Sequence, residues 1–324
     1  MLGFIVRRLV TSLFVLFLAS MLVFGAVSSL GDPLASLRAN PRTPPAVIEA
    51  KKRELNLDKS VPQRYVIWLK DFVSGDLGTD NRGREIAPRL TRAMQLTIRL
   101  AIGATILAAF LAVVVGVYSA VRQYTISDYV LTFIGFLFLS TPVFWLAGLL
   151  KLYGAIEVND FFGRRLVYTQ GDSSPNFDGG FVGRMGDYAG HTILPVIALA
   201  LISFAAWSRY QRATMLDVLN SDYVRLARAK GLKNRRVLVR HALRNALIPL
   251  VTVMAIDIGA VFAGAIITET VFNWSGMGRL FIDALRGYES NVLLAWMMVT
   301  GVFVIVFNLF ADLLYGVLDP RIRV

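Results

Sequence analysis

Six stretches of about twenty residues, each long enough to cross a lipid bilayer as a helix, determine what this chain can fold into. They occupy residues 9–30, 100–121, 129–150, 188–208, 245–268 and 290–311. Five of them contain no Asp, Glu, Lys or Arg, and the stretch 245–268 contains one acid, Asp257. Because hydrocarbon offers no water to backbone N–H and C=O groups, apolar stretches of this length cross a membrane as helices. The sequence predicts an all-α integral membrane protein with six transmembrane helices.

The composition excludes several other classes of protein. Hydrophobic residues make up 56% of the chain and charged residues 17%, which is far from the composition of a soluble domain. The net charge of +12 could indicate nucleic-acid binding, but the basic residues are sorted between the loops rather than gathered in one soluble module. The chain has no cysteine, so disulfides, thiolate catalysis and cysteine metal sites are excluded.

The positively charged loops give the orientation in the membrane. Residues 209–244 contain ten basic and two acidic residues, and Arg122 and the tail residues Arg321 and Arg323 lie on the same side if the spans alternate. Short loops rich in Lys and Arg stay in the cytoplasm, so we expect both chain ends to be cytoplasmic. The mixed-charge segment 31–99 is then external, because long segments cross the membrane largely regardless of charge.

The basic loop has the pattern of a helical hairpin. One helix is expected from about Asp222 to Lys230, ending at Gly231, which can adopt a left-handed conformation. A second helix, carrying Arg235, Arg236 and further arginines, leads into the next span. The arginines could merely anchor the loop at anionic lipid headgroups. Anchoring alone does not require the spacing of small residues in this hairpin, so we favour a surface that docks a partner.

No catalytic motif accompanies the spans. The sequence lacks an H-E-x-x-H helix, a G-x-S-x-G turn with triad partners and a G-x-x-x-x-G-K-S/T phosphate loop. Its two histidines, His191 and His241, do not form a ligand cluster, so we expect no metal site. If transport is driven by nucleotide, the ATPase must be another polypeptide, and the basic hairpin is the surface on which it would dock.

Two acids in or near the spans are candidates for a translocation pathway. Asp257 is costly in a membrane helix, and both a pathway-lining role and a structural hydrogen-bonding role remain open for it. Glu269 lies nearer the external boundary, where water can solvate it, so we favour a structural role there.

Small residues and prolines mark special positions in the spans. Small side chains recur at every fourth position in the second span and again in the fifth, namely at Ala104, Ala108, Ala112 and Gly116, and at Gly259, Ala260, Ala263 and Gly264. Such stripes let helices approach closely, although lining a passage is the alternative. Pro142 and Pro195 predict local bends.

The external regions also show a pattern. A short helix is expected to begin near Pro62, with Tyr65, Trp68, Leu69 and Phe72 on one face. We favour packing over substrate contact for this aromatic face. The second external loop, with GDSSPNFDGG at 171–180, is expected to be irregular.

Short characteristic segments are spread along essentially the whole chain. They are FIVRRL at 4–9, LGDP at 30–33, LNLDKSVPQRYVIWL and GDLG within 55–78, STPVFWLAGLL at 140–150, ARAKGL at 227–232, ETVFNWSGMGRL at 269–280 and NLFADLLYGVLDPRIR at 308–323. In these segments the chain resembles the permeases of type I ABC importers, and in detail the B-type permease subunits of dipeptide and oligopeptide importers. The order and spacing of the segments make the resemblance specific.

The resemblance implies a division of the chain and a function. Residues 1–30 would form the cytoplasmic start and first span, 31–94 an external segment with short helices, 95–318 the permease core with a coupling loop at 209–244, and 319–324 a cytoplasmic tail. The chain would be a non-catalytic subunit in a bacterial cell membrane, forming half of a peptide pathway that works by alternating access. A secondary transporter or channel that works without an ATPase is the alternative.

The resemblance also implies partners and site residues. The partners would be a second, C-type permease, two P-loop ATPases that bind ATP and magnesium, an external substrate-binding protein and the bilayer, with no nucleic acid. No cofactor would be bound by this chain itself. The ATPase-coupling residues would be Asp222, Tyr223, Arg225, Ala227, Arg228, Ala229, Lys230, Gly231, Arg235 and Arg236, and the pathway candidates Asp257, Glu269 and Asn308.

Two departures from the family pattern limit what is carried over. The usual coupling signature is Glu-Ala-Ala, three residues, then Gly, whereas this chain has Arg225, Leu226 and Ala227 before Gly231. A salt bridge of the missing Glu therefore cannot be assigned. The stretch RGYESN at 286–291 also differs from the acidic, proline-containing sequence usual there.

Overall fold

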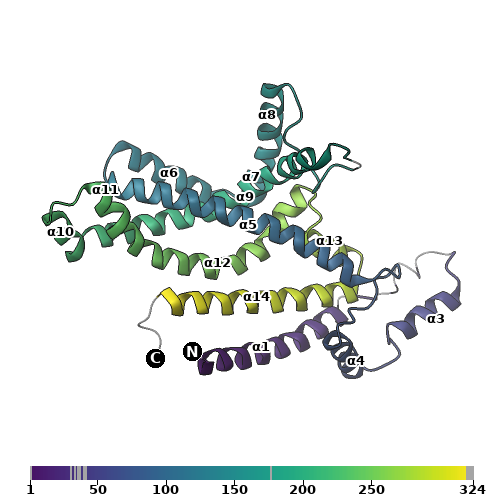
Figure 1. Ribbon diagram of the computed structural model, residues 1–324. Helices are drawn as coiled ribbons and strands as arrows, with labels where there is room; N and C mark the ends of the chain where they lie inside the picture. Colours follow the sequence, from purple (N-terminus) through teal and green to yellow (C-terminus); the bar gives the residue numbers. More distant parts are fainter. Residues whose placement is uncertain are drawn as a thin grey trace. The chain divides into compact units, whose positions relative to one another are not determined.

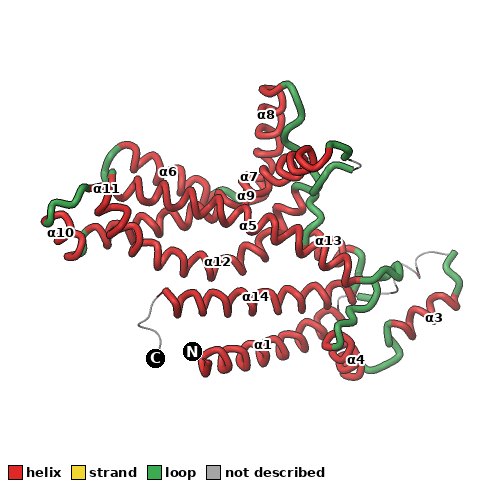
Figure 2. The backbone as a smooth tube through the Cα atoms, in the orientation of Figure 1, coloured by secondary structure: helices red, strands yellow, loops and turns green. Residues whose placement is uncertain are grey.

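The computed structural model describes residues 2–29, 31–32, 34, 38, 42–175 and 177–318, with the backbone alone at 2–5, 256, 258–264 and 311–318. Within these residues the regular secondary structure is helical, apart from one isolated β-bridge between Thr79 and Glu85 (Figure 2). Five helices are long and apolar enough to cross a membrane, and a sharply bent pair of helices makes a sixth candidate span. The prediction of an all-α membrane protein is therefore confirmed.

The chain divides into two compact units, which are described separately. The first unit comprises residues 1–95 and 276–309, and the second comprises residues 96–275 and 310–324. Helix α5 (Ile86–Val121) begins in the first unit and continues in the second, and α14 (Ser290–Leu318) crosses the same boundary near its end.

The first unit is built on two long apolar helices, α1 (Leu2–Ser29) and the first two thirds of α14, which lie side by side in Figure 1. They approach closely because Gly301 has no side chain: a Cβ there would lie 2.9 Å from Cδ1 of Leu16. The short helices α3 (Pro45–Glu54), α4 (Val61–Val73) and α13 (Met277–Arg286) complete this unit. Helix α13 is tied to α14 by the indole of Trp296, which donates to the carbonyl of Met277 at 2.7 Å.

Helix α4 shows why the aromatic face of the external segment exists. The side chain of Gln63 accepts a hydrogen bond from the backbone N–H of Ser60 at 3.2 Å, which caps the helix start. Tyr65 and Trp68 then lie against Phe24 of α1, each with ring centroids 5.5 Å away, and the Tyr65 hydroxyl is 2.8 Å from that of Ser20. Part of this face thus packs against α1, as expected.

The second unit is a bundle around α9 (Gly180–Leu219), a continuous helix of 40 residues. The remainder of α5 packs along it through its small residues: Ala104, Ala108 and Ala112 are buried, and a Cβ at Gly116 would lie 2.8 Å from the carbonyl oxygen of Ser208. This stripe packs helix against helix rather than lining an open passage. The corresponding small residues at 259–264 lie outside the side chains that the structure describes.

The third predicted span is not one helix. It consists of α6 (Ile126–Ser140), a break, and α7 (Val143–Leu149), which continues through a π-helical turn, η1 (Leu150–Gly154), into α8 (Ala155–Phe162). The two arms are bent by 108°. The bend predicted at Pro142 is thus a sharp break in the candidate span, because Pro142 has no N–H to continue the helix and forces Thr141 into an extended conformation (ψ 125°). Pro195, by contrast, lies inside the uninterrupted α9.

The basic loop leads from α9 into the last helix of this unit. It consists of α10 (Asp222–Ala229), a turn, α11 (Asn234–Arg236), a π-helical segment, η2 (Val237–Leu243), and then α12 (Arg244–Val271). In Figure 1, α10 and α11 lie side by side at one end of the bundle. The predicted helical hairpin is confirmed, and the predicted external loop at 171–180 is irregular up to the start of α9.

Candidate functional site

The hairpin, residues 222–236, has a buried face and an exposed face. Val224 and Ala227 point inward, where they pack with Met215 of α9 and with Val237 and Ala242 of η2. Their spacing of three residues places both on one side of α10. This packing fixes the helix on the bundle, so the opposite face is presented at a defined orientation.

The exposed face is apolar at its centre and basic around it. Tyr223 is 43% exposed and Leu226 is 56% exposed. The predicted residues that are also exposed are Asp222, Arg225, Arg228, Ala229, Lys230, Gly231, Arg235 and Arg236. The structure thus brings the predicted coupling residues together on one surface, with Ala227 alone turned inward.

Gly231 makes the turn between the two helices. Its φ of +74° lies in the left-handed region, and its N–H donates to the carbonyl of Arg228 at 2.9 Å. No atom lies within 4 Å of the place where a Cβ would stand. Glycine is therefore required here by backbone conformation and not by lack of space.

The charge of this face is only weakly neutralised within the chain. Arg225 and Asp222 form an ion pair at 3.8 Å, with side chains 69% and 101% exposed. Exposed pairs of this kind contribute little to stability. The guanidinium groups of the hairpin therefore remain available to an acidic or carbonyl-rich partner surface.

A buried ion pair ties the hairpin end of α9 to α6. Arg212 donates to both carboxylate oxygens of Asp128, at 3.0 Å from Nε and 2.8 Å from Nη2. Ser119 of α5 and the backbone N–H of Tyr124 also donate to this carboxylate. Asp128 is 2% exposed, and its contacts join α5, α6 and the last third of α9.

Two of the three pathway candidates, Asp257 and Glu269, lie in the second unit and are well separated along α12. Asp257 accepts a hydrogen bond from the indole of Trp207 at 2.7 Å. Glu269 accepts one from the hydroxyl of Thr97 at 2.5 Å and is fully buried. Both acids lie on α12, twelve residues or roughly 18 Å apart. The expectation that water solvates Glu269 was wrong, because the side chains of the bundle cover it. Asn308 is exposed on α14 in the first unit.

The sequence did not reveal a cluster of polar side chains that joins the loop before α9 to the first turns of that helix. The hydroxyl of Ser174 donates to Asp187 Oδ1 at 2.5 Å and lies 3.2 Å from Nε2 of His191. Nδ1 of that histidine faces the carbonyl of Gln170 at 3.0 Å, and the ring stacks on Tyr168. These contacts fasten the loop to the start of α9. Because the carboxylate binds Ser174 and a carbonyl occupies Nδ1, the cluster does not have the geometry of a catalytic triad.

A cluster of donors around the Asp80 carboxylate, which the sequence also did not reveal, stabilises residues 80–89 of the first unit. Asp80 is 1% exposed and accepts hydrogen bonds from the backbone N–H groups of Arg82 and Arg84 and from the Arg84 guanidinium. The guanidinium of Arg89 binds Oδ2 at 2.5 Å, the same oxygen that accepts from the Arg84 guanidinium. Burial alone would raise the pKa of Asp80, but these donors outweigh burial and hold its pKa below the ordinary value. The D-x-x-G pattern at 80–83 is the sequence signal of this turn.

The comparison with family models covers the whole chain. Residues 112–324 match the model described as "Binding-protein-dependent transport system inner membrane component", and residues 1–114 match the model of the N-terminal part of such membrane components. The chain belongs to this family. It is therefore a multi-pass inner-membrane permease, the non-catalytic component of a transporter that works with a binding protein and an ATPase.

Full-length relatives support the same assignment. The chain is 41% identical over 322 residues to the oligopeptide transport system permease protein OppB of Mycobacterium tuberculosis, covering 99% of both chains. It is 36% identical over 345 residues to the dipeptide transport system permease protein DppB of Escherichia coli, covering 100% of this chain and 99% of the relative. It is also 35% identical to the oligopeptide permease AppB of Bacillus subtilis, over the full length of both.

A solved structure shows the same fold. The inward-facing MetNI methionine ABC transporter aligns with a TM-score of 0.56 at 15% identity, covering 71% of this chain and 96% of that chain. The fold is thus that of an ABC transporter permease, and the alternative of a channel or secondary transporter is set aside by the family membership.

Proposed function

We propose that this chain forms half of the translocation pathway of an ATP-driven importer of dipeptides or oligopeptides. Relatives named as peptide permeases, 35–41% identical along the full chain, support the choice of cargo. The other half would be a second, similar permease, and an external binding protein would deliver the peptide. Two ATPase subunits would bind ATP and magnesium on the cytoplasmic side.

The observation that carries the proposal is the hairpin surface. Its inner face is locked to the bundle by Val224 and Ala227, while its outer face presents Tyr223, Leu226 and a ring of basic residues. A helix that is fixed on one side can transmit displacement, because a push on the exposed face moves the bundle to which it is packed. We infer that the ATPase binds this face and that its two states favour two arrangements of the spans.

The transport cycle follows from this coupling. When the ATPases close on ATP, the hairpin moves with them, the spans tilt and the passage opens outward to receive peptide. Hydrolysis and release return the bundle to the inward-open arrangement. Among the polar side chains of the spans, Asp257 and Glu269 are the candidates for lining this passage, together with Asn308 of α14. The division into an external segment at 31–94 and a core at 95–318 remains part of this proposal.

Site-specific crosslinking tests the docking. The chain has no cysteine, so Arg225→Cys introduces a unique thiol on the exposed face. We expect this thiol to crosslink to an ATPase subunit in the assembled complex, whereas Asp58→Cys, exposed in the external segment, should not. Crosslinking of the second position alone, or labelling of the first from outside the cell, would overturn the proposed docking and orientation.

Peptide uptake tests the cargo. Proteoliposomes that contain the two permeases and the ATPases, with ATP inside and binding protein outside, should accumulate a dipeptide or an oligopeptide. Accumulation that depends on an ion gradient and not on ATP would contradict the proposal.

A further inference from the structure

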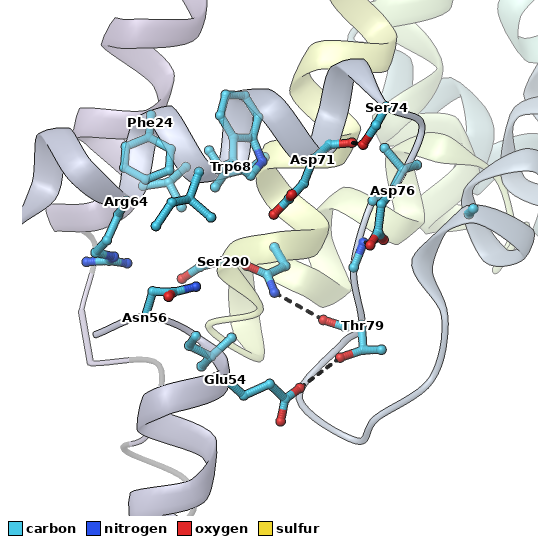
Figure 3. Close-up of a pocket in the computed structure, with 18 of the residues that line it drawn as sticks. Phe24, Glu54, Asn56, Arg64, Trp68, Asp71, Ser74, Asp76, Thr79 and Ser290 are labelled. Carbon is cyan, nitrogen blue, oxygen red and sulfur yellow. Dashed lines mark hydrogen bonds between the residues drawn. The ribbon is translucent and has the colours of Figure 1, made fainter. Parts of the chain in front are cut away.

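A cavity lies in the part of the first unit that we expect to be external. It has a volume of about 760 Å³, is open on one side, and is lined by the end of α1, the end of α3, helix α4, the segment 74–79, residues at the start of α5 and the start of α14 (Figure 3). Small-molecule sites in proteins have volumes of roughly 300–1,000 Å³. The cavity is therefore large enough for a ligand and not only for water.

The lining combines an apolar wall with charged groups of both signs. Phe24, Ile67 and Trp68 supply apolar surface. Four carboxylates and one guanidinium face the same space, namely Glu54, Asp71, Asp76, Glu85 and Arg64. In Figure 3 the guanidinium of Arg64 lies at one side of the cavity and Asp76 at the opposite side. The cavity is thus net negative in a chain whose total charge is +12.

Two of these charges are already engaged within the unit. Glu54 accepts hydrogen bonds from Lys51 at 2.6 Å and from the hydroxyl of Thr79 at 3.0 Å. Asp76 accepts one from the backbone N–H of Gly78 at 2.8 Å. These contacts shape the cavity and leave less of their charge for a ligand.

Asp71 and Arg64 are not engaged in this way. Within the part of the chain that the structure describes, neither side chain forms a hydrogen bond or an ion pair. The guanidinium of Arg64 lies 5.9 Å from the ring centroid of Phe24, and its partial burial lowers its pKa with no carboxylate to offset this. A partly buried guanidinium without an anionic partner is stabilised when an anion binds it, so Arg64 favours the binding of a carboxylate or another anion.

The spacing of these two residues sets a length. They are seven residues apart on α4, so they lie on one face, roughly 10 Å apart along the helix axis. Two to three extended residues of a peptide span roughly 7–11 Å. A metal ion fits this arrangement poorly, because in the described residues no three or more His, Cys, Asp or Glu side chains are close enough to share one.

We propose that this cavity binds a short peptide by its two charged ends, with the α-ammonium group at Asp71 and the α-carboxylate at Arg64. The apolar wall of Phe24, Ile67 and Trp68 receives a side chain of the peptide. This inference rests on the proposed function, and it adds to it an external capture site on the permease itself with a preference for two or three residues.

Binding measurements on the full-length chain in lipid nanodiscs test the site. The probes are tri-alanine, its N-acetylated form and its C-amidated form. Blocking either end should weaken binding at least about tenfold. Asp71→Asn should remove the difference between tri-alanine and its acetylated form, and Arg64→Gln should remove the difference between tri-alanine and its amidated form. The matched exposed variants Asp58→Asn and Lys70→Gln, which do not line the cavity, should bind like the parent chain.

Several results would overturn the inference. Tri-alanine could fail to bind saturably, or its affinity could be unchanged in both Asp71→Asn and Arg64→Gln. Nα-acetyl-lysine methylamide could bind as tightly as tri-alanine, which would indicate a site for a basic side chain of a protein partner. Hexa-alanine could bind as tightly as tri-alanine, which would refute the length preference.

ATP-driven uptake by the complete complex separates this inference from the proposed function. If peptide uptake persists and the nanodisc-embedded chain does not bind tri-alanine, the capture site is wrong and the importer stands. If the chain binds tri-alanine as described and the complete complex imports no peptide, the proposed function is wrong while the ligand class of the cavity stands.

Discussion

The turn of the hairpin allows a graded test of how the proposed coupling works. Gly231 has a φ of +74° and open space around its Cβ position, so a side chain there disturbs the backbone and nothing else within the chain. A non-glycine residue in the left-handed region costs roughly 1–2 kcal/mol, and asparagine tolerates that region better than alanine or valine. A bias of this size corresponds to roughly a 5–30-fold change in the population of the hairpin conformation that binds the ATPase.

The expected order of damage is therefore set by backbone preference. Gly231→Asn should have the mildest effect, Gly231→Ala should weaken ATPase binding roughly 5–30-fold, and Gly231→Val should be worse. Membrane insertion should be unchanged. The assays are ATPase affinity for the reconstituted permeases and peptide imported per ATP hydrolysed. Gly163→Ala is a matched control, since Gly163 has a φ of +62° and equally open space but ends α8.

Two results would refute this reasoning. If the asparagine variant is more damaged than the alanine variant, the size of the side chain matters and the partner must approach the turn closely. If the control at Gly163 reduces coupling as much as the change at Gly231, the effect is a general loss of stability and does not arise at the hairpin.

Three further predictions concern buried polar groups. Arg212→Leu should lower the free energy of unfolding by about 3–5 kcal/mol, because Asp128 stays buried without its guanidinium partner. Replacing both residues by leucine should lower the denaturation midpoint less than Arg212→Leu alone. Equal losses in the two variants would contradict the pairing. Asp257→Asn keeps an oxygen that can accept from the Trp207 indole, so it should leave the free energy of unfolding nearly unchanged, whereas Asp257→Leu should lower it by about 1–3 kcal/mol. The opposite order of the two variants would argue against a hydrogen-bonding role. The pKa of Asp80 is lowered in the folded chain, so its carboxylate should stabilise the fold above its ordinary pKa of 3.8, and this stabilisation should be lost as the pH falls below that value. Thermal denaturation at several pH values should show a smaller dependence of stability on pH for Asp80→Asn than for the parent chain. An unchanged dependence in the variant would show that the contacts around Asp80 are not formed.

The helices could be predicted from the sequence because their causes are local. Charge-free stretches gave the spans, and Gly231 marked the end of α10. The break in the third span was foreseen only as a local bend at Pro142. Its angle of 108° depends on how the second arm packs, which the residues around the proline do not encode.

The side-chain contacts could not be predicted in the same way, because they join residues far apart in the sequence. Glu269 is covered through a contact with Thr97, and Asp128 meets Arg212 from another helix. The T-x-x-D pattern at 125–128 does indicate a helix start, where the Thr125 hydroxyl accepts from the backbone N–H of Asp128, but it does not indicate the arginine. The cavity in the first unit likewise combines residues of five helices, so its lining appears only in three dimensions.

The uninterrupted course of α9 has a mechanical consequence. At 40 residues the helix is roughly 60 Å long along its path and runs from the loop held by Ser174 and His191 to Leu219, three residues before the first residue of the hairpin. A rod of that length, rotated by about 5° around its midpoint, displaces its two tips by roughly 2.6 Å in opposite directions. A movement of the loop at one end of α9 would then move the hairpin at the other end, because both are attached to the same helix.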